Sequence, residues 1–126
     1  MTDGVVLDAS ALLALLGRER GWERVRDALP SAAISTVNLA EVAGKLIDRG
    51  VAASRVDELV DFGLERIPLD ESMAFVAAQL KPTTRGLSLG DRCCLATAWC
   101  LGRPALTADV AWQRLHIDGL EVLLVR

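Results

Sequence analysis

The segment Val5-Val6-Leu7-Asp8 constrains the fold of this chain more than any other part of the sequence. Three apolar residues, two of them β-branched, run directly into a carboxylate. The next segment, Ala9–Leu16, is rich in Ala and Leu and is predicted to be a helix. Asp8 therefore lies where a buried strand ends and a helix begins. Ligands bind at this edge of open parallel sheets, and a buried charge is costly unless it is compensated. We predict that Asp8 forms one corner of a metal site.

Short apolar strands alternate with helices along the rest of the chain, which is the pattern of parallel βαβ units. We expect an α/β fold, a three-layer α/β/α sandwich with a central, mainly parallel sheet, formed as a single domain over residues 1–126. The predicted strands are Val5–Asp8, Ala32–Ile34, a part of Leu64–Leu69, Ala105–Thr107 and Leu120–Val125. The predicted helices are Ala9–Leu16, Trp22–Leu29, a helix from Ser35 or Thr36 to Arg49, a helix from Ser54 to Gly63, Glu71–Leu80, a helix from Ser88 to Leu101, and Val110–Leu115.

The bulk properties of the sequence argue against several classes of protein. No apolar run reaches the ~18 residues of a membrane span, and Met1–Gly4 has neither the charge nor the cleavage pattern of a signal peptide. We therefore expect a cytoplasmic protein that does not contact a membrane. His116 is the only histidine, and the chain has no glycine-rich phosphate loop. A Ser/His/Asp device or a loop that cradles phosphates thus has little support.

Three further acids occupy positions that are comparable to that of Asp8. Asp109 follows the predicted strand Ala105–Thr107, whereas Glu41 and Asp91 lie in the first or second turn of helices that can start at the same sheet edge. Carboxylates that converge on one pocket repel each other and raise each other's pKa, and bound hard cations remove this penalty. Oxygen ligands select Mg²⁺ or Mn²⁺ over zinc. The four acids therefore predict a magnesium or manganese site.

Each of these acids also has a purely structural explanation. The alternatives are a helix cap for Asp8, an ion pair with Lys45 for Glu41, a capping box with Ser88 for Asp91, and a cap of its own short helix for Asp109. The spacing of Asn38, Glu41, Lys45 and Asp48 also predicts a polar stripe along one helix face. The argument for a site comes from the joint arrangement of the four acids rather than from any one of them.

Four motifs give the chain a resemblance to a known family. They are Val6-Leu7-Asp8-Ala9-Ser10, the segment from Ile34 to Glu41, Leu87-Ser88-Leu89-Gly90-Asp91, and Leu106-Thr107-Ala108-Asp109. In their order and spacing the chain resembles the PIN-domain ribonucleases, specifically the VapC toxins of bacterial toxin–antitoxin pairs. The resemblance covers essentially the whole chain and implies a PIN-like fold.

The resemblance also implies a function and a set of site residues. It implies a metal-dependent endoribonuclease that acts on RNA, a cognate VapB-like antitoxin that inhibits it, and a homodimer. Asp8, Glu41, Asp91 and Asp109 would hold one or two Mg²⁺ or Mn²⁺ ions, and Ser10, Asn38 and Thr107 would support them. Some relatives carry a further acid two residues after the last Asp, where this chain has Ala111. That departure weakens the expectation of a second ion but not of the first.

Three basic residues and two rival functions complete the expectations from sequence. Lys81, Arg85 and Arg92 are candidates for contacts with RNA phosphates, or else ordinary solvated charges.

One rival function is a phospho-acceptor receiver domain. Such a domain needs a Lys after a late strand, and neither Lys45 nor Lys81 stands there. The other rival is a non-catalytic PIN-like binding module. The presence of all four acids argues against that module.

Overall fold

Five short parallel strands form the centre of the molecule in the computed structural model, which describes residues 4–126. Most of the segment used for the expectation about a signal peptide, residues 1–3, lies outside the described residues. The strands are β1 (Val5–Leu7), β2 (Ala32–Ser35), β3 (Glu65–Ile67), β4 (Ala105–Thr107) and β5 (Val122–Leu124). Their order across the sheet is β3-β2-β1-β4-β5, and every paired strand is parallel to its neighbour.

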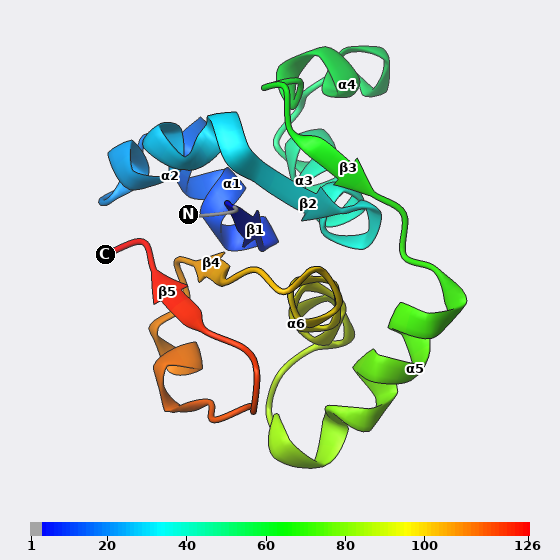
Figure 1. Ribbon diagram of the computed structural model, residues 1–126. Helices are drawn as coiled ribbons and strands as arrows, with labels where there is room; N and C mark the ends of the chain where they lie inside the picture. The colour runs from blue at the N-terminus through cyan, green and yellow to red at the C-terminus, as the bar shows by residue number, and fades with distance from the viewer. Residues whose placement is uncertain (1–3) are drawn as a thin grey trace.

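Helices cover both faces of this sheet, so the predicted three-layer α/β/α sandwich is confirmed (Figure 1). The α-helices are α1 (Ala9–Leu16), α2 (Trp22–Ala28), α3 (Thr36–Asp48), α4 (Val56–Leu59), α5 (Glu71–Gln79) and α6 (Leu89–Leu101). Short 3-10 helices include η3 (Lys81–Thr83) and η4 (Val110–Arg114). No helix among residues 4–126 is both long enough and apolar enough to cross a membrane.

Alternation along β1 divides the apolar core into two halves. Val5 and Leu7 pack with α1 to α4 on one face of the sheet, whereas Val6 packs with α5, α6 and Trp112 on the other face. Successive side chains of a strand point to opposite faces, so a strand that is covered on both sides must be apolar throughout. All three β1 residues are accordingly buried.

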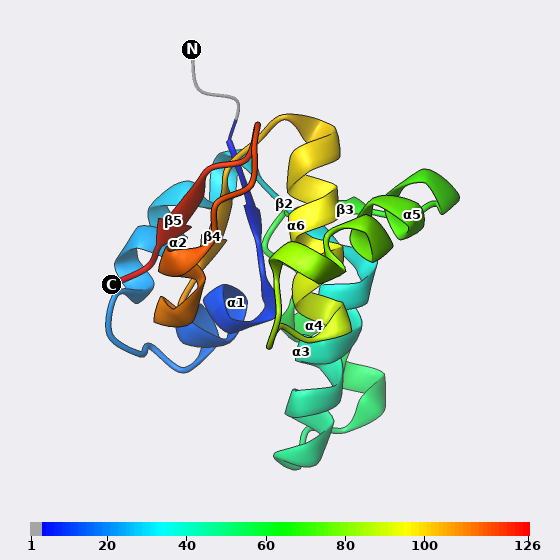
Figure 2. The same cartoon turned by 90° about the horizontal axis from the view of Figure 1, so that it is seen from below.

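The carboxyl ends of the central strands meet at one edge of the sheet (Figure 2). Leu7 at the end of β1 is in register with Ile34 of β2 and with Leu106 of β4. The residues that follow these strands therefore emerge side by side. Asp8 and Asp109 follow two of the three strands, and α3 begins directly after β2. The predicted common edge for Asp8 and Asp109 is thus confirmed.

Two predicted helices are wrong in length or type. The helix expected from Ser54 to Gly63 is a 3-10 turn followed by the single turn of α4, because Ser54 lies within the 3-10 turn and does not cap the helix. The segment expected as a helix over 110–115 is the 3-10 helix η4. The other predicted helices end within one residue of their expected ends, and each strand lies within its predicted range or exceeds it by one residue.

Candidate active site

Asp8 is the most deeply buried of the four acids and occupies the junction of β1 and α1. Its side chain is only 3% exposed and caps α1 by accepting a hydrogen bond from the Ala11 backbone N–H at 2.9 Å. The Ser10 hydroxyl donates to Asp8 Oδ1 at 2.7 Å, and the Thr107 hydroxyl donates to Oδ2 at 2.7 Å. The helix-capping interpretation of Asp8 is therefore correct. Three donors also hold both carboxylate oxygens in one orientation.

The two hydroxyl groups connect Asp8 to the end of β4. Ser10 Oγ accepts from the Ala108 backbone N–H at 2.9 Å, and Thr107 Oγ1 accepts from the Asp109 backbone N–H at 3.0 Å. Each hydroxyl thus uses its single proton on the carboxylate and a lone pair on the β4 loop. This arrangement fixes the backbone of Asp109 relative to the carboxylate of Asp8. Ser10 and Thr107, two of the three residues expected to support the site, thus both contact the Asp8 carboxylate.

Burial raises the pKa of Asp8 from its ordinary value of 3.8 to about 6. Removal from water is the largest cause, because it disfavours the charged carboxylate. The hydrogen bonds from Thr107, Ser10 and Ala11 oppose this effect, and the charge of Asp91 adds to it. The influence of Asp91 shows that the two carboxylates lie within electrostatic reach of each other.

We predict that this raised pKa makes the stability of the metal-free protein depend on pH. Between pH 3.8 and about 6 the folded state retains the Asp8 proton that the unfolded state has lost, so the free energy of unfolding should fall as pH rises through that window. A rise in pKa from 3.8 to about 6 corresponds to a change on the order of 3 kcal/mol in the free energy of unfolding. Urea unfolding in EDTA at pH 4 and pH 7 measures it. Asp8→Asn is the control, because Asn does not titrate, and parallel pH profiles for both proteins would contradict the prediction.

Glu41 is held by a buried asparagine that also contacts the start of α6. Asn38 is 1% exposed, and its Nδ2 donates to Glu41 Oε1 at 2.7 Å and to the Gly90 carbonyl oxygen at 3.0 Å. The alternative role of Glu41 is not observed, since no ion pair with Lys45 occurs among residues 4–126. Asn38 therefore positions the Glu41 carboxylate beside α6.

Gly90 leaves the space that the Glu41 carboxylate fills. A Cβ atom at Gly90 would lie 2.5 Å from Glu41 Oε1 and 2.7 Å from Oε2, which is closer than real Cβ contacts allow. Gly90 immediately precedes Asp91, so this contact places the Glu41 carboxylate against the residue next to another of the four candidate acids. Sequence reasoning included Gly90 in a motif but did not assign it this role.

Asp91 and Asp109 both act as helix caps in this structure. Asp91 forms the predicted capping box with Ser88, in which Asp91 Oδ2 accepts from the Ser88 backbone N–H and Ser88 Oγ accepts from the Asp91 backbone N–H, each at 3.1 Å. Asp109 Oδ1 accepts from the Ala111 backbone N–H at 2.9 Å at the start of η4. Capping is compatible with ligand binding, because a carboxylate has about four acceptor positions.

The four acids surround one edge of the sheet without forming a closed cluster. Among residues 4–126, no three Asp, Glu, His or Cys side chains are close enough to hold a metal ion together. Three of the four acids lie within electrostatic reach of one buried residue, Cys94. Burial raises the pKa of the Cys94 thiol, and the charges of Asp8, Asp91 and Glu41 raise it further. Three carboxylates from three elements therefore act on the same interior point.

The residues at this edge fit a hard divalent cation in their chemistry. All the candidate side-chain donors are oxygens, which is the ligand type that Mg²⁺ and Mn²⁺ prefer. Asn38 Oδ1 is buried and has no hydrogen-bond partner among the described residues. Such an atom is costly unless an ion or a water satisfies it. The site therefore matches the expected cofactor in donor type and in its unsatisfied acceptor.

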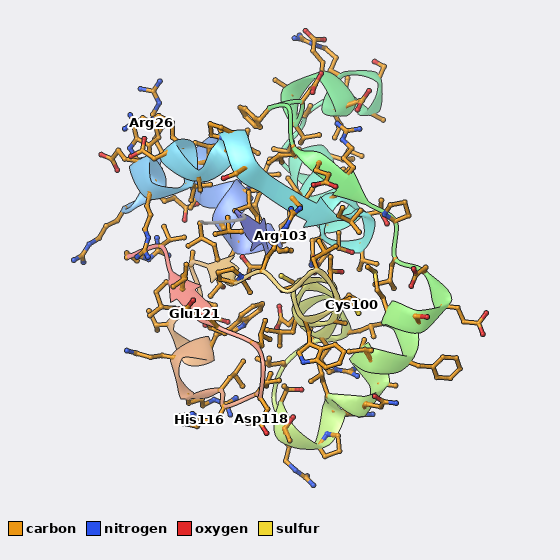
Figure 3. All side chains as sticks on the ribbon, viewed as in Figure 1. Arg26, Cys100, Arg103, His116, Asp118 and Glu121 are labelled. Carbon is orange, nitrogen blue, oxygen red and sulfur yellow. The ribbon has the colours of Figure 1, made fainter. Side chains whose placement is uncertain are left out.

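The histidine and the cysteines do not form an alternative catalytic device. Figure 3 shows His116 and Asp118 next to each other on the segment that precedes β5. The His116 side chain makes no hydrogen bond or ion pair within the part of the chain that the structure describes. Cys93 and Cys94 are buried and Cys100 is exposed, and burial raises the pKa of all three thiols. A thiolate nucleophile is thus disfavoured.

The three predicted phosphate contacts lie together in one cavity. Lys81, Arg85 and Arg92 line a cavity of about 600 Å³ between η3 and the start of α6. A fourth cation was missed by sequence reasoning, because nothing local connects it to the others. Arg114 of η4 donates from Nη2 to the Arg85 carbonyl oxygen at 2.8 Å. None of these four cations takes part in the ion pairs found among residues 4–126.

Comparisons with known proteins place this geometry in context. A family model described as PIN domain matches residues 5–117. A chain from a toxin–antitoxin complex of Klebsiella pneumoniae aligns with a TM-score of 0.76 and 21% identity over 93% of this chain and 95% of that chain. A chain of DNA-bound VapBC from Salmonella typhimurium gives 0.73 and 18% over 100% of both chains.

VapBC2 from Rickettsia felis, bound to a DNA fragment from its promoter, contains another similar chain. It aligns with a TM-score of 0.72 and 14% identity over 95% of this chain and 97% of that chain. No curated protein matched the sequence. At these identities the matches to solved structures show a shared fold.

Proposed function

Because the chain belongs to the PIN domain family, as the resemblance of its motifs predicted, we propose that it is a metal-dependent endoribonuclease of the VapC toxin type. Its fold is that of chains from VapBC complexes. The observation that carries the proposal is the arrangement of acids from separate elements around the carboxyl edge of the sheet, with Asp8 buried and oriented by three donors.

In the proposed mechanism, each part of the edge has a distinct task. Asp8, Glu41, Asp91 and Asp109 would hold Mg²⁺ or Mn²⁺. A bound ion of this kind lowers the pKa of water and stabilises charge on a phosphate during phosphodiester hydrolysis. The Ser10 and Thr107 hydroxyls keep both oxygens of Asp8 aimed at the site. Asn38 keeps Glu41 beside Gly90 and presents its own free Oδ1.

The basic cavity beside the acids supports a polyanionic substrate. Lys81, Arg85 and Arg92 would contact RNA phosphates on one side of the scissile bond. The overall formal charge of −3, which includes these three cations, disfavours binding of nucleic acid over the whole surface, so a local concentration of positive charge is what a phosphate contact requires. The acids and the cations would therefore have different roles, since the acids would bind the metal ion and the cations would bind the substrate.

We further propose that a cognate VapB-like antitoxin binds this protein and that the protein forms a homodimer. The support is the shared fold with chains crystallised in toxin–antitoxin complexes, two of which contain DNA. An inhibitor of a metal-dependent nuclease works most directly by covering the acidic edge, where a basic side chain would compete with the ion.

The receiver-domain alternative finds no support in the fold. A receiver needs a Lys after a late strand, but β4 is followed by Ala108 and Asp109, and β5 is followed by Val125 and Arg126. The non-catalytic binding module has the same fold as the nuclease. An activity measurement therefore has to separate these two.

The test of the proposed function is RNA cleavage with and without divalent metal. We expect excess EDTA to abolish cleavage and added Mg²⁺ or Mn²⁺ to restore it. In the proposed reaction the nucleophile is a water whose pKa is lowered by the bound ion, and the acids alone do not activate water in this way. Circular dichroism in EDTA controls for unfolding. Manganese should also raise the melting temperature, since a ligand that binds the folded state stabilises it. Undiminished cleavage in EDTA, or no cleavage under either condition, would refute the proposal.

A further inference from the structure

The cavity between η3 and the start of α6 combines apolar walls with a cationic rim. Ala78, Pro82 and Leu87 supply the apolar part, and Lys81 and Arg85 are exposed at the rim. Its volume of about 600 Å³ lies within the usual range for small-ligand pockets, which is roughly 300–1,000 Å³. Phosphate contact alone requires only surface charge. An apolar recess beside the charges therefore indicates a ligand with both a flat apolar part and a phosphate.

Hydrogen bonds to main-chain carbonyl groups fix the walls of this cavity. Thr84 is 1% exposed, and its hydroxyl donates to the Leu80 carbonyl oxygen at 2.7 Å. Arg92 Nη1 donates to the Ala77 carbonyl oxygen at 3.4 Å, which holds its guanidinium group at the cavity wall. A planar guanidinium stacks on aromatic rings as well as pairing with phosphate.

The cavity adjoins the proposed catalytic edge through consecutive residues of one helix turn. Asp91 belongs to the acids, and the next residue, Arg92, lines the cavity. Figure 2 shows the segment that joins α5 to α6 beside the first turns of α6. Asp91 and Arg92 are thus the point at which the acids and the cavity meet along the chain.

We propose that this cavity receives one unpaired base of the RNA substrate, next to the phosphate that is cleaved. Arg92 stacks on the base, and Lys81, Arg85 and Arg114 hold its phosphate. The proposal rests on the proposed nuclease function and adds a binding place for one base of the substrate. A base can enter the cavity only after it leaves its helix, and proteins recognise RNA mainly through such unstacked bases. The cavity would thus bind a base from a single-stranded loop but none from a duplex.

The test measures binding of RNA in EDTA, where turnover is prevented. The probes are a short fluorescent single-stranded RNA of mixed sequence and the same RNA in a full duplex. We expect the wild-type protein to bind the single strand more tightly. Ala78→Trp fills the cavity from the exposed face of α5, and it should weaken single-strand binding roughly tenfold, the usual effect of losing one stacked base. Its effect on duplex binding should stay within about twofold, because duplex contacts are phosphate contacts.

Two further variants make the result specific to the cavity. Ala74→Trp places the same side chain one turn earlier on α5, at an exposed position that does not line the cavity, and it should bind as the wild type does. Arg92→Lys keeps the charge but removes the planar group, so it should weaken binding of the single strand and spare the duplex. This second substitution decides the matter if Ala78→Trp fails to fold.

Several outcomes would overturn the cavity proposal. The proposal is wrong if Ala78→Trp and Arg92→Lys both bind the single strand as tightly as the wild type does. It is also wrong if these variants lose as much affinity for the duplex as for the single strand. Displacement of the RNA by a polyglutamate peptide as effective as unlabelled RNA would make the cavity a site for acidic peptides instead. Binding in EDTA is measured without the ion that the acids would hold. A protein with cavity-dependent binding but no cleavage in Mn²⁺ would therefore refute only the nuclease function.

Discussion

Asp91→Asn should reduce RNA cleavage by orders of magnitude while leaving the fold nearly intact. The asparagine side chain retains an oxygen that can accept the Ser88 backbone N–H, so the capping box largely survives. Loss of the charge at the helix N-terminus costs about 0.3–1 kcal/mol. The charge of Asp91 also raises the pKa of Asp8, and its removal relieves that repulsion. Metal binding should weaken because one anionic ligand is lost.

Ser88→Ala is the matched control for this experiment. It removes the hydroxyl that accepts the Asp91 backbone N–H at 3.1 Å but keeps the carboxylate. It should cost about 1 kcal/mol of stability, as the loss of a helix N-cap usually does, and should leave most of the cleavage activity. The measurements are melting temperature in EDTA and in Mn²⁺, together with the cleavage rate. If the asparagine variant cleaved RNA within a few-fold of wild type and gained as much stability from Mn²⁺, Asp91 would be only a cap.

The positions of the acids could be read from sequence because they depend on local patterns. Asp8 and Asp109 follow short apolar strands, and parallel strands bring their carboxyl ends to one edge. The alternative capping roles are equally local, and the structure contains them for Asp8, Asp91 and Asp109. A pattern that predicts both a cap and a ligand cannot choose between them, since the same carboxylate can serve both.

The contacts between distant segments could not be read in this way. The spacing of the polar residues in α3 placed Asn38 on a polar stripe, yet it is buried because α6 packs over it and accepts its amide N–H through Gly90. Arg114 approaches Arg85 only because η4 lies beside the loop before α6. Such contacts depend on the angles between elements. A single sequence carries no local signal for those angles.

Gly90→Ala should reduce activity without reducing the stability of the fold, and it should distinguish these two effects better than the removal of any acid. The added Cβ would lie 2.5 Å from Glu41 Oε1, so one of the two groups must move. The carboxylate is the flexible end of a partly free side chain, and it should swing away at little cost. Alanine is also the better helix former by about 1 kcal/mol. We therefore expect the melting temperature in EDTA to stay level or to rise.

The same displacement should damage the chemistry. Moving Glu41 breaks its 2.7 Å hydrogen bond with Asn38 and draws the carboxylate away from Gly90. Loss of such supporting contacts typically costs about 10–100-fold in metal affinity or activity, so cleavage and the stabilisation by Mn²⁺ should fall together. Gly44→Ala is the control. Gly44 lies on the same helix as Glu41, and a Cβ atom added there would meet no other atom within 4 Å. If Gly90→Ala lost stability but kept its activity, Glu41 would have no part in the site. Equal loss of activity in both variants would instead trace the effect to helix propensity rather than to the carboxylate.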